Sequence, residues 1–147
     1  MIEQLLTDAK KACRTFQMVD SDTKIQALES IAKYLIQKQD VILQANEKDI
    51  AQAKENGISS AMIDRLLLTS DRIQEISDGV LKVAHLEDPV GQVIREIHRP
   101  NGLLIKQIRI PIGTVGVVYE ARPNVTVDIA AICIKTVSYT HLTLPTT

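Results

Sequence analysis

The chain contains 147 residues with a formal net charge of -1, and 45% of its residues are hydrophobic while 24% are charged. This balance is typical of a soluble globular protein long enough to bury a core of ordinary domain size. Because basic and acidic residues are interspersed and aromatic residues make up only 3%, the composition argues against a nucleic-acid or membrane partner.

The sequence carries no pattern that directs it out of the cytoplasm. The amino-terminal MIEQLLTDAKKAC has acidic residues and a helical apolar period, unlike a secretory signal peptide. Uncharged apolar runs are much shorter than a membrane span. Cys13 and Cys133 lie far apart, so neither a disulfide framework nor a metal site is expected, and a reducing cytoplasm is the default. Cys133, among isoleucine and alanine, is expected to be a buried, unreactive thiol.

Five amphipathic helices are predicted in the first 88 residues, each with apolar residues at spacings of three and four. Asp20 or Ser21 can cap the second helix, and Thr69-Ser70-Asp71 can cap the fifth. Asn56-Gly57 tolerates the left-handed conformation that ends many helices, and therefore closes the third. The predicted helices cover about residues 2–16, 21–36, 40–55, 60–68 and 70–83.

A β-hairpin is predicted after the helices, because from residue 93 the helical period gives way to β-branched residues. Pro100-Asn101-Gly102 interrupts this stretch, and Asn-Gly adopts positive φ at low cost, as a tight hairpin turn requires. Residues 93–99 and 103–110 should therefore pair as an antiparallel ribbon. Neither face of this ribbon is cleanly apolar, so it requires cover from another domain or subunit.

A strand, a polar turn and a helix are predicted for residues 112–136. Residues 112–119 are uncharged and rich in β-branched residues, which is typical of a strand buried on both faces. The cluster 120–124 ends this strand, and apolar residues recur at helical spacing from there on. In open α/β sheets ligands bind beyond the carboxyl ends of the strands, so Glu120, Arg122 and Asn124 are the candidate ligand-facing residues.

The residues around this turn have structural as well as functional interpretations. Arg122 is held extended by Pro123 and directs its guanidinium either toward a ligand above the sheet or into a surface ion pair. Asn124 is suited to cap the following helix. Gly113 and Gly116 form only a Gly-x-x-Gly, which favours close strand packing over phosphate binding.

The motifs IPIGTVGVVYEARPNVTVDIAAICIKT, RPNGLLIKQIRIP, AHLEDPVGQV and IDRLLLTSDRI together resemble the γ-glutamyl phosphate reductase family of the aldehyde dehydrogenase superfamily. YEARPNVTVD with RPNGL upstream is not a generic α/β pattern, so the resemblance is specific. It extends back to ANEKDI and covers nearly the whole chain up to Thr136, but only about the first third of the family's length.

The resemblance implies an α/β fold with a truncated cofactor domain. Residues 1–88 would form an amino-terminal helical region, and residues 89–111 a β-hairpin used in homo-oligomerisation. Residues 112–136 would form the first strand, turn and helix of a Rossmann-like NADP-binding domain.

The implied reaction is the NADPH-dependent reduction of L-glutamyl 5-phosphate to L-glutamate 5-semialdehyde in proline biosynthesis, through a thioester on a cysteine. Asn124 falls where the superfamily carries an asparagine whose side-chain amide stabilises an oxyanion. The resemblance places the nucleophilic cysteine downstream of this chain, so Cys133 is not expected to fill that role.

Residues 137–147, VSYTHLTLPTT, depart from the family, which would continue with a Ser-Gly-Asn turn, a second strand and an Arg-Gly-Gly loop. This threonine-rich tail looks like translated sequencing adaptor, so we interpret the chain as an inactive amino-terminal fragment with an artefactual end. Two other interpretations are open: a helical interaction module that docks through its hairpin, and a small anion-binding domain that uses residues 122–124.

Overall fold

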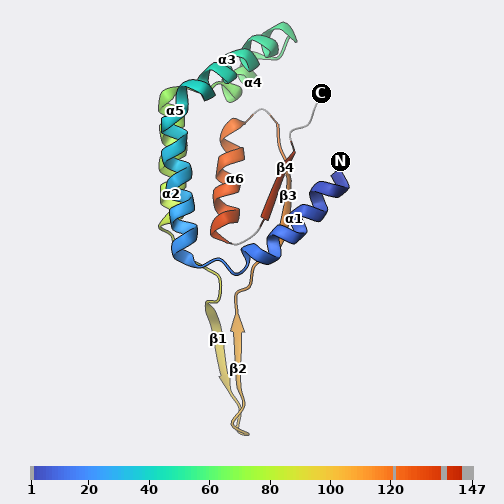
Figure 1. Cartoon of the computed structure of the whole chain (residues 1–147), viewed down its shortest axis with the longest axis vertical. Helices are drawn as coiled ribbons and strands as arrows, with labels where there is room; N and C mark the ends of the chain where they lie inside the picture. The colour runs from blue at the N-terminus through green and yellow to red at the C-terminus, as the bar shows by residue number, and fades with distance from the viewer. Residues whose placement is uncertain (1, 121, 137–138, 144–147) are drawn as a thin grey trace.

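The computed structural model describes residues 2–120, 122–136 and 139–143 of the chain. Within this part, five helices are followed by a hairpin, a strand, a sixth helix and a last strand, so the predicted order of elements up to residue 136 is confirmed (Figure 1). The helices are α1 (Ile2–Phe16), α2 (Ser21–Gln37), α3 (Gln39–Glu55), α4 (Ser60–Leu66), α5 (Ser70–Ala84) and α6 (Pro123–Lys135). The strands are β1 (Val93–His98), β2 (Leu104–Ile108), β3 (Thr114–Val118) and β4 (Tyr139–Thr143).

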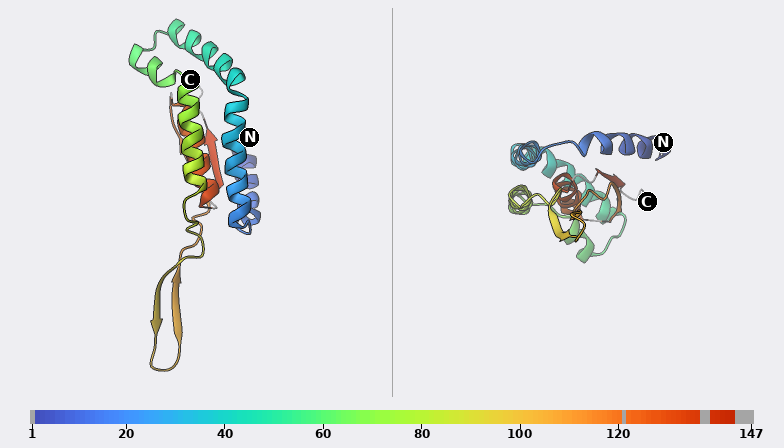
Figure 2. Two further views of the ribbon diagram at one scale, coloured as in Figure 1. Left: turned by 90° about the vertical axis from the view of Figure 1, so that its left-hand side faces the viewer. Right: turned by 90° about the horizontal axis from the view of Figure 1, so that it is seen from below.

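The elements form layers around a small parallel sheet. Helices α2 and α5 lie side by side, α6 packs against them, and β3 and β4 follow, with α1 on the opposite side of the sheet (Figure 1). Helices α3 and α4 lie at one end of these layers, and the hairpin of β1 and β2 projects from the other end (Figure 2). None of the helices within the described ranges is both long and apolar enough to cross a bilayer.

The hydrophobic core lies where α2, α5 and α6 meet. Leu28 and Val80 are almost completely buried there, and alanines at the same contacts allow the helix backbones to approach closely. Half-buried residues of the three helices surround this cluster, and α6 contributes one side of its helix to it. The surrounding residues are Ile31, Leu35, Leu81, Val83, Val127 and Ile134. The opposite side of α6 is less well covered, because Ile132 is 52% exposed.

Helices α2, α3 and α5 begin or end at the predicted capping residues. Asp20 accepts the backbone N–H of Thr23 at 2.7 Å, and this bond lowers the pKa of the Asp20 carboxyl. Thr69 caps α5 through the N–H of Arg72, and Gly57 adopts a φ of 70° after α3. Helix α4 ends at Leu66 rather than at the predicted residue 68.

The early end of α4 has a specific cause in α3. Asn46 is 6% exposed, and its side-chain amide donates to the Leu66 carbonyl while its oxygen accepts the N–H of Leu68, both at 2.8 Å. This buried asparagine therefore satisfies backbone groups that a longer helix would have paired internally. Because Asn46 is polar, the apolar periodicity of α3 does not predict its burial.

The prediction that β3 is buried on both faces is wrong. Its residues alternate between exposed and half-buried, and Val118 is 79% exposed. The reason is incomplete cover, since the only strand paired with β3 in the described part of the chain is β4.

Strand β4 was not predicted from the sequence. It pairs in parallel with β3, from Thr114 opposite Tyr139 to Val118 opposite Thr143. With α6 as the crossover, β3 and β4 make a βαβ unit. The unpaired edge of β3 offers backbone hydrogen bonds to any short extended segment, and the threonine-rich tail provides one. Residues 137, 138 and 144–147 of the predicted tail lie outside the described residues.

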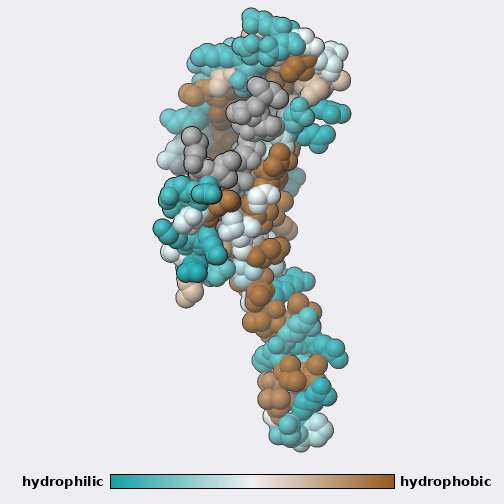
Figure 3. Space-filling model, turned by 90° about the vertical axis from the view of Figure 1, so that its right-hand side faces the viewer, coloured by the Kyte–Doolittle hydropathy of each residue, from teal (hydrophilic) through white to brown (hydrophobic). Residues whose placement is uncertain are grey.

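The hairpin forms as predicted, with β1 and β2 antiparallel and Ile97 opposite Ile105. Gly102 adopts a φ of 83° in the connecting turn, where positive φ favours glycine. A Glu96–Lys106 ion pair of 2.7 Å joins the two strands. Almost every residue of the hairpin is exposed, and apolar side chains alternate with polar ones along its surface (Figure 3).

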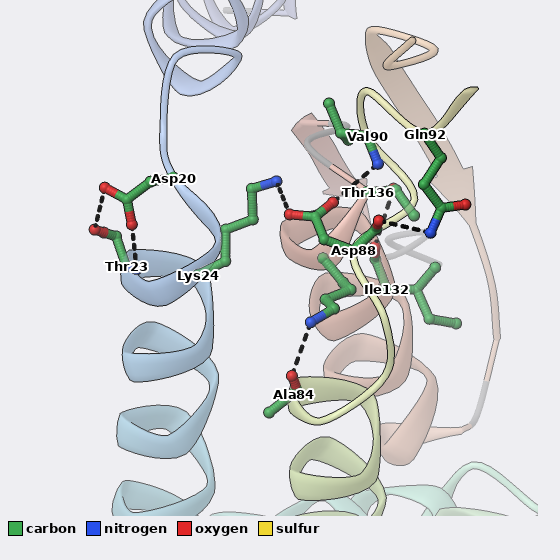
Figure 4. Close-up of polar contacts among 10 residues, drawn as sticks. Asp20, Thr23, Lys24, Ala84, Asp88, Val90, Gln92, Ile132 and Thr136 are labelled. Carbon is green, nitrogen blue, oxygen red and sulfur yellow. Dashed lines mark hydrogen bonds and ion pairs between the residues drawn. The ribbon is translucent and has the colours of Figure 1, made fainter. Parts of the chain in front are cut away.

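Two buried lysines connect α2 and α6 to the end of α5 and the segment that follows it. Lys24 of α2 is 2% exposed and forms an ion pair of 2.7 Å with Asp88, whose other oxygen accepts the N–H of Val90 (Figure 4). Lys135, at the end of α6, is 3% exposed and donates to the Ala84 carbonyl at 2.8 Å. The connection from α5 to the hairpin is thereby held against the start of α2.

Candidate functional site

A pocket of about 480 Å³ lies between α4, α5 and the start of α6. It contains two of the three predicted ligand-facing residues, Arg122 and Asn124, whereas Glu120 is exposed outside its lining. The remaining lining comes from the α4–α5 region and from the first turns of α6. These residues are Asp64, Arg65, Leu67, Leu68, Arg72, Glu75, Ile76, Pro123 and Asp128.

The turn before α6 holds Arg122 in the conformation expected from its neighbour. Its φ of -142° and ψ of 87° are extended, as a residue before proline prefers. Helix α6 then begins at Pro123, whose fixed φ and missing N–H suit the first helical position. The Tyr119 hydroxyl contacts the Thr126 hydroxyl, so the end of β3 is tied to the first turn of α6.

The prediction that Asn124 caps α6 is wrong, because the helix already includes this residue. Its side-chain Nδ2 instead donates to Asp128 Oδ2 at 3.1 Å, one helical turn further on. A primary amide has two N–H groups, so one remains for a ligand. The positive end of the α6 dipole lies at the same place and favours a negative charge there.

Arg72 forms part of the scaffold of the pocket. It donates to the carbonyl oxygens of Asp64 and Leu67 at 2.6 and 2.7 Å, and pairs with the Asp64 carboxylate at 3.1 Å. Together with Asn46 it fixes the connection between α4 and α5. Pocket residues lie on both sides of this connection, in α4 and in α5.

Three charged side chains of the pocket have no such internal partner. Those of Arg65, Glu75 and Arg122 make no hydrogen bond or ion pair with any other residue in the described part of the chain. Arg122 was predicted from the sequence, whereas Arg65 and Glu75 were not. Both belong to the segment IDRLLLTSDRIQE, whose charges follow an ordinary amphipathic pattern, so only its approach to α6 distinguishes them.

Other predicted features lie away from this pocket. Gly113 precedes β3 and Gly116 lies within it, and both line a separate cavity of about 600 Å³ beside α1. Cys133 is a free thiol and is 7% exposed, so its predicted burial is confirmed. The described residues contain no cluster of histidine, cysteine, aspartate or glutamate that could hold a metal ion.

Comparisons with known proteins agree with the resemblance inferred from the motifs. No protein-family model matches the chain. It is 53% identical over 127 residues to the γ-glutamyl phosphate reductase of Geobacillus sp. (strain WCH70), which covers 86% of this chain and 31% of that protein.

Two solved structures of γ-glutamyl phosphate reductases have the same fold over this length. The Thermotoga maritima protein has a TM-score of 0.90 and 35% identity, covering 94% of this chain and 33% of that one. The Saccharomyces cerevisiae protein has a TM-score of 0.92 and 32% identity, covering 96% and 36%. The predicted resemblance and fold class are thus confirmed, and the chain spans about a third of the length of these relatives.

Proposed function

We propose that this chain is part of a cytoplasmic reductase that converts L-glutamyl 5-phosphate to L-glutamate 5-semialdehyde in proline biosynthesis. The identity of 53% over 127 residues to a γ-glutamyl phosphate reductase carries the proposal. The pocket supports it, because its charged side chains and the start of α6 suit a small anionic substrate.

The chemistry of such a reduction divides between this segment and the remainder of the enzyme. A cysteine thiolate from outside this chain attacks the acyl phosphate, phosphate leaves, and a thioester remains. The nicotinamide of NADPH would, when bound, supply the hydride that replaces the thiolate on the acyl carbon, which gives the aldehyde and frees the cysteine. Negative charge develops on the acyl oxygen in both steps, and Asn124 has a free N–H to stabilise it.

The described residues do not fit a dinucleotide by themselves. Gly113 and Gly116 lie before and within β3, whereas a pyrophosphate-binding glycine loop follows the strand and opens the helix. The turn that does open α6 contains Arg122 and Pro123 and no glycine. This segment therefore acts at the acyl end of the reaction, and further strands adding to β3 and β4 would complete the proposed cofactor domain.

The experiment that tests this function compares two proteins. The full-length reductase carrying this segment should oxidise L-glutamate 5-semialdehyde in the presence of NADP and phosphate, measured as NADPH absorbance. The 147-residue chain alone should not, because the proposed nucleophile is absent from it. Absence of turnover in the full-length protein would refute the function, and turnover by the chain alone would refute our placement of the nucleophile.

We also propose that residues 137–147 do not belong to the reductase. Re-reading the source DNA across codon 136 should give a frame that continues into Ser-Gly-Asn. A confirmed stop codon after Thr147 would contradict this proposal.

We further propose that the hairpin joins copies of the enzyme into a homo-oligomer. Leu104, Ile105 and Ile108 are between 40% and 50% exposed, and the outer edges of β1 and β2 have no strand paired to them in the described part of the chain. A second copy would cover such a ribbon.

Replacing Ile105 with aspartate is therefore expected to reduce the full-length enzyme to a smaller species, because a charge would enter the interface core. Size-exclusion chromatography with light scattering measures this change. Ile105→Val is the matched control and should keep the wild-type mass. An unchanged mass for Ile105→Asp would exclude the hairpin from the interface.

A further inference from the structure

The pocket between α4, α5 and α6 contains charged side chains that have no partner within the described part of the chain. Arg72 and Asp64 pair with each other, and Asp128 accepts a hydrogen bond from Asn124. Asp128 keeps its charge because this donor is a neutral amide, and the side chains with no internal bond at all are two guanidinium groups and one carboxylate, on Arg65, Arg122 and Glu75. A ligand that satisfies all three must carry both a negative and a positive group.

We propose that this pocket binds the zwitterionic end of an α-amino acid, with Arg65 and Arg122 on the α-carboxylate and Glu75 on the α-ammonium group. The assignment rests on the proposed function, of which it specifies the substrate recognition. The planar guanidinium matches a carboxylate through two parallel hydrogen bonds. A carboxylate is the corresponding partner for an ammonium group, which has donors and no acceptor.

The position of Asn124 in the same pocket connects this recognition to the reacting carbon. In a glutamyl group the α-carbon and the reacting carbonyl carbon are three carbon–carbon bonds apart, about 4 Å when extended. A cavity of about 480 Å³ holds both ends of such a substrate at once. The amino-acid end would therefore bind among Arg65, Arg122 and Glu75, and the acyl end would lie beside Asn124.

The scaffold of the pocket fixes the backbone that carries Arg65 and Glu75 before the substrate arrives. Arg72 fixes the end of α4, where Arg65 lies, and Asn46 fixes the connection to α5, which carries Glu75. A pocket that pairs with both charged groups of the correct substrate has one of its own side chains left unpaired by an analogue that lacks a group. The pocket therefore selects against aldehydes without the amino-acid end.

The test measures substrate preference in the full-length reductase, in the direction of aldehyde oxidation. L-glutamate 5-semialdehyde is compared with 5-oxopentanoate, which lacks the ammonium group, and with 4-aminobutanal, which lacks the α-carboxylate. Glu75→Gln should reduce the kcat/KM preference over 5-oxopentanoate about 10- to 100-fold, as expected for one charge-assisted hydrogen bond. Arg65→Gln should reduce the preference over 4-aminobutanal by a similar factor.

The control is Lys82→Gln, which removes an exposed charge of α5 outside the pocket lining and should leave both preferences unchanged. Equal loss of activity toward every aldehyde in Glu75→Gln and Arg65→Gln would overturn the proposal, as would unchanged preferences. If the wild-type enzyme oxidises none of the three aldehydes, the proposed function itself fails.

A second measurement requires no variant. L-Glutamate should inhibit the wild-type enzyme competitively with the semialdehyde, and glutarate and 4-aminobutyrate, which each lack one group of the zwitterion, should inhibit at least about tenfold more weakly. Equal inhibition by all three compounds would exclude recognition of the amino-acid end.

Discussion

Replacing Asn124 with alanine is expected to lower the kcat of the full-length reductase about 100-fold, the usual effect of losing one oxyanion donor. The side chain is exposed in the pocket, and its internal hydrogen bond to Asp128 uses only one of its two N–H groups. In the proposed function, the remaining N–H donates to a charge that exists only in the transition state and in the intermediate. The loss should therefore fall on kcat more than on KM.

Stability measurements separate this role from a structural one. The side chain of Asn124 donates a hydrogen bond to Asp128, an exposed partner one turn away, so its truncation should change the thermal unfolding midpoint little. Asn56→Ala, at the end of α3, is the matched control and should leave kcat unchanged. A shift in the unfolding midpoint with an unaltered kcat would instead show that Asn124 serves only the start of α6.

The local features of the fold could be predicted because neighbouring residues determine them. Asp20 and Thr69 cap their helices through N–H groups three residues away, and Gly102 adopts the positive φ of its hairpin turn. The extended Arg122 likewise follows from the proline beside it.

Features that depend on distant contacts could not be predicted in this way. The sequence of β3 is that of a strand with cover on both faces, but burial requires layers that other segments must supply. Arg65 and Glu75 acquire significance only because the α4–α5 region packs beside the start of α6. The role of Asn124 depends on where α6 begins. Because the helix begins two residues earlier than predicted, Asn124 is a pocket residue and not a cap.

Replacing Asp88 with alanine is expected to destabilise the 147-residue chain by about 3 to 5 kcal/mol, the usual cost of removing one partner of a buried ion pair. Lys24 is 2% exposed and Asp88 17%, and their charged atoms are 2.7 Å apart. The variant would leave the Lys24 ammonium group buried without a counter-charge. Urea denaturation followed by circular dichroism measures the change in the free energy of unfolding.

A double variant tests whether the unpaired charge is the cause. Lys24→Met combined with Asp88→Ala removes both charges and should recover much of the lost stability, since apolar replacement of a buried pair is often neutral or better. A double variant as unstable as Asp88→Ala would mean that Asp88 acts mainly through its bond to Val90.

The contribution of Asp88 to the free energy of unfolding should also depend on pH, and it should decrease on acidification. Burial acts to raise the pKa of Asp88, but the hydrogen bonds from Lys24 and Val90 and the charges of Lys24 and Lys135 outweigh it, so the pKa is lowered. A carboxyl with a lower pKa in the folded state stabilises the fold fully above its unfolded pKa of about 4. That stabilisation is lost as the pH falls through the folded pKa, because the protonated carboxyl no longer pairs with Lys24. The difference in the free energy of unfolding between the wild type and Asp88→Ala should therefore be constant near pH 7 and shrink below about pH 4. A difference that grows on acidification would contradict the ion pair as its source.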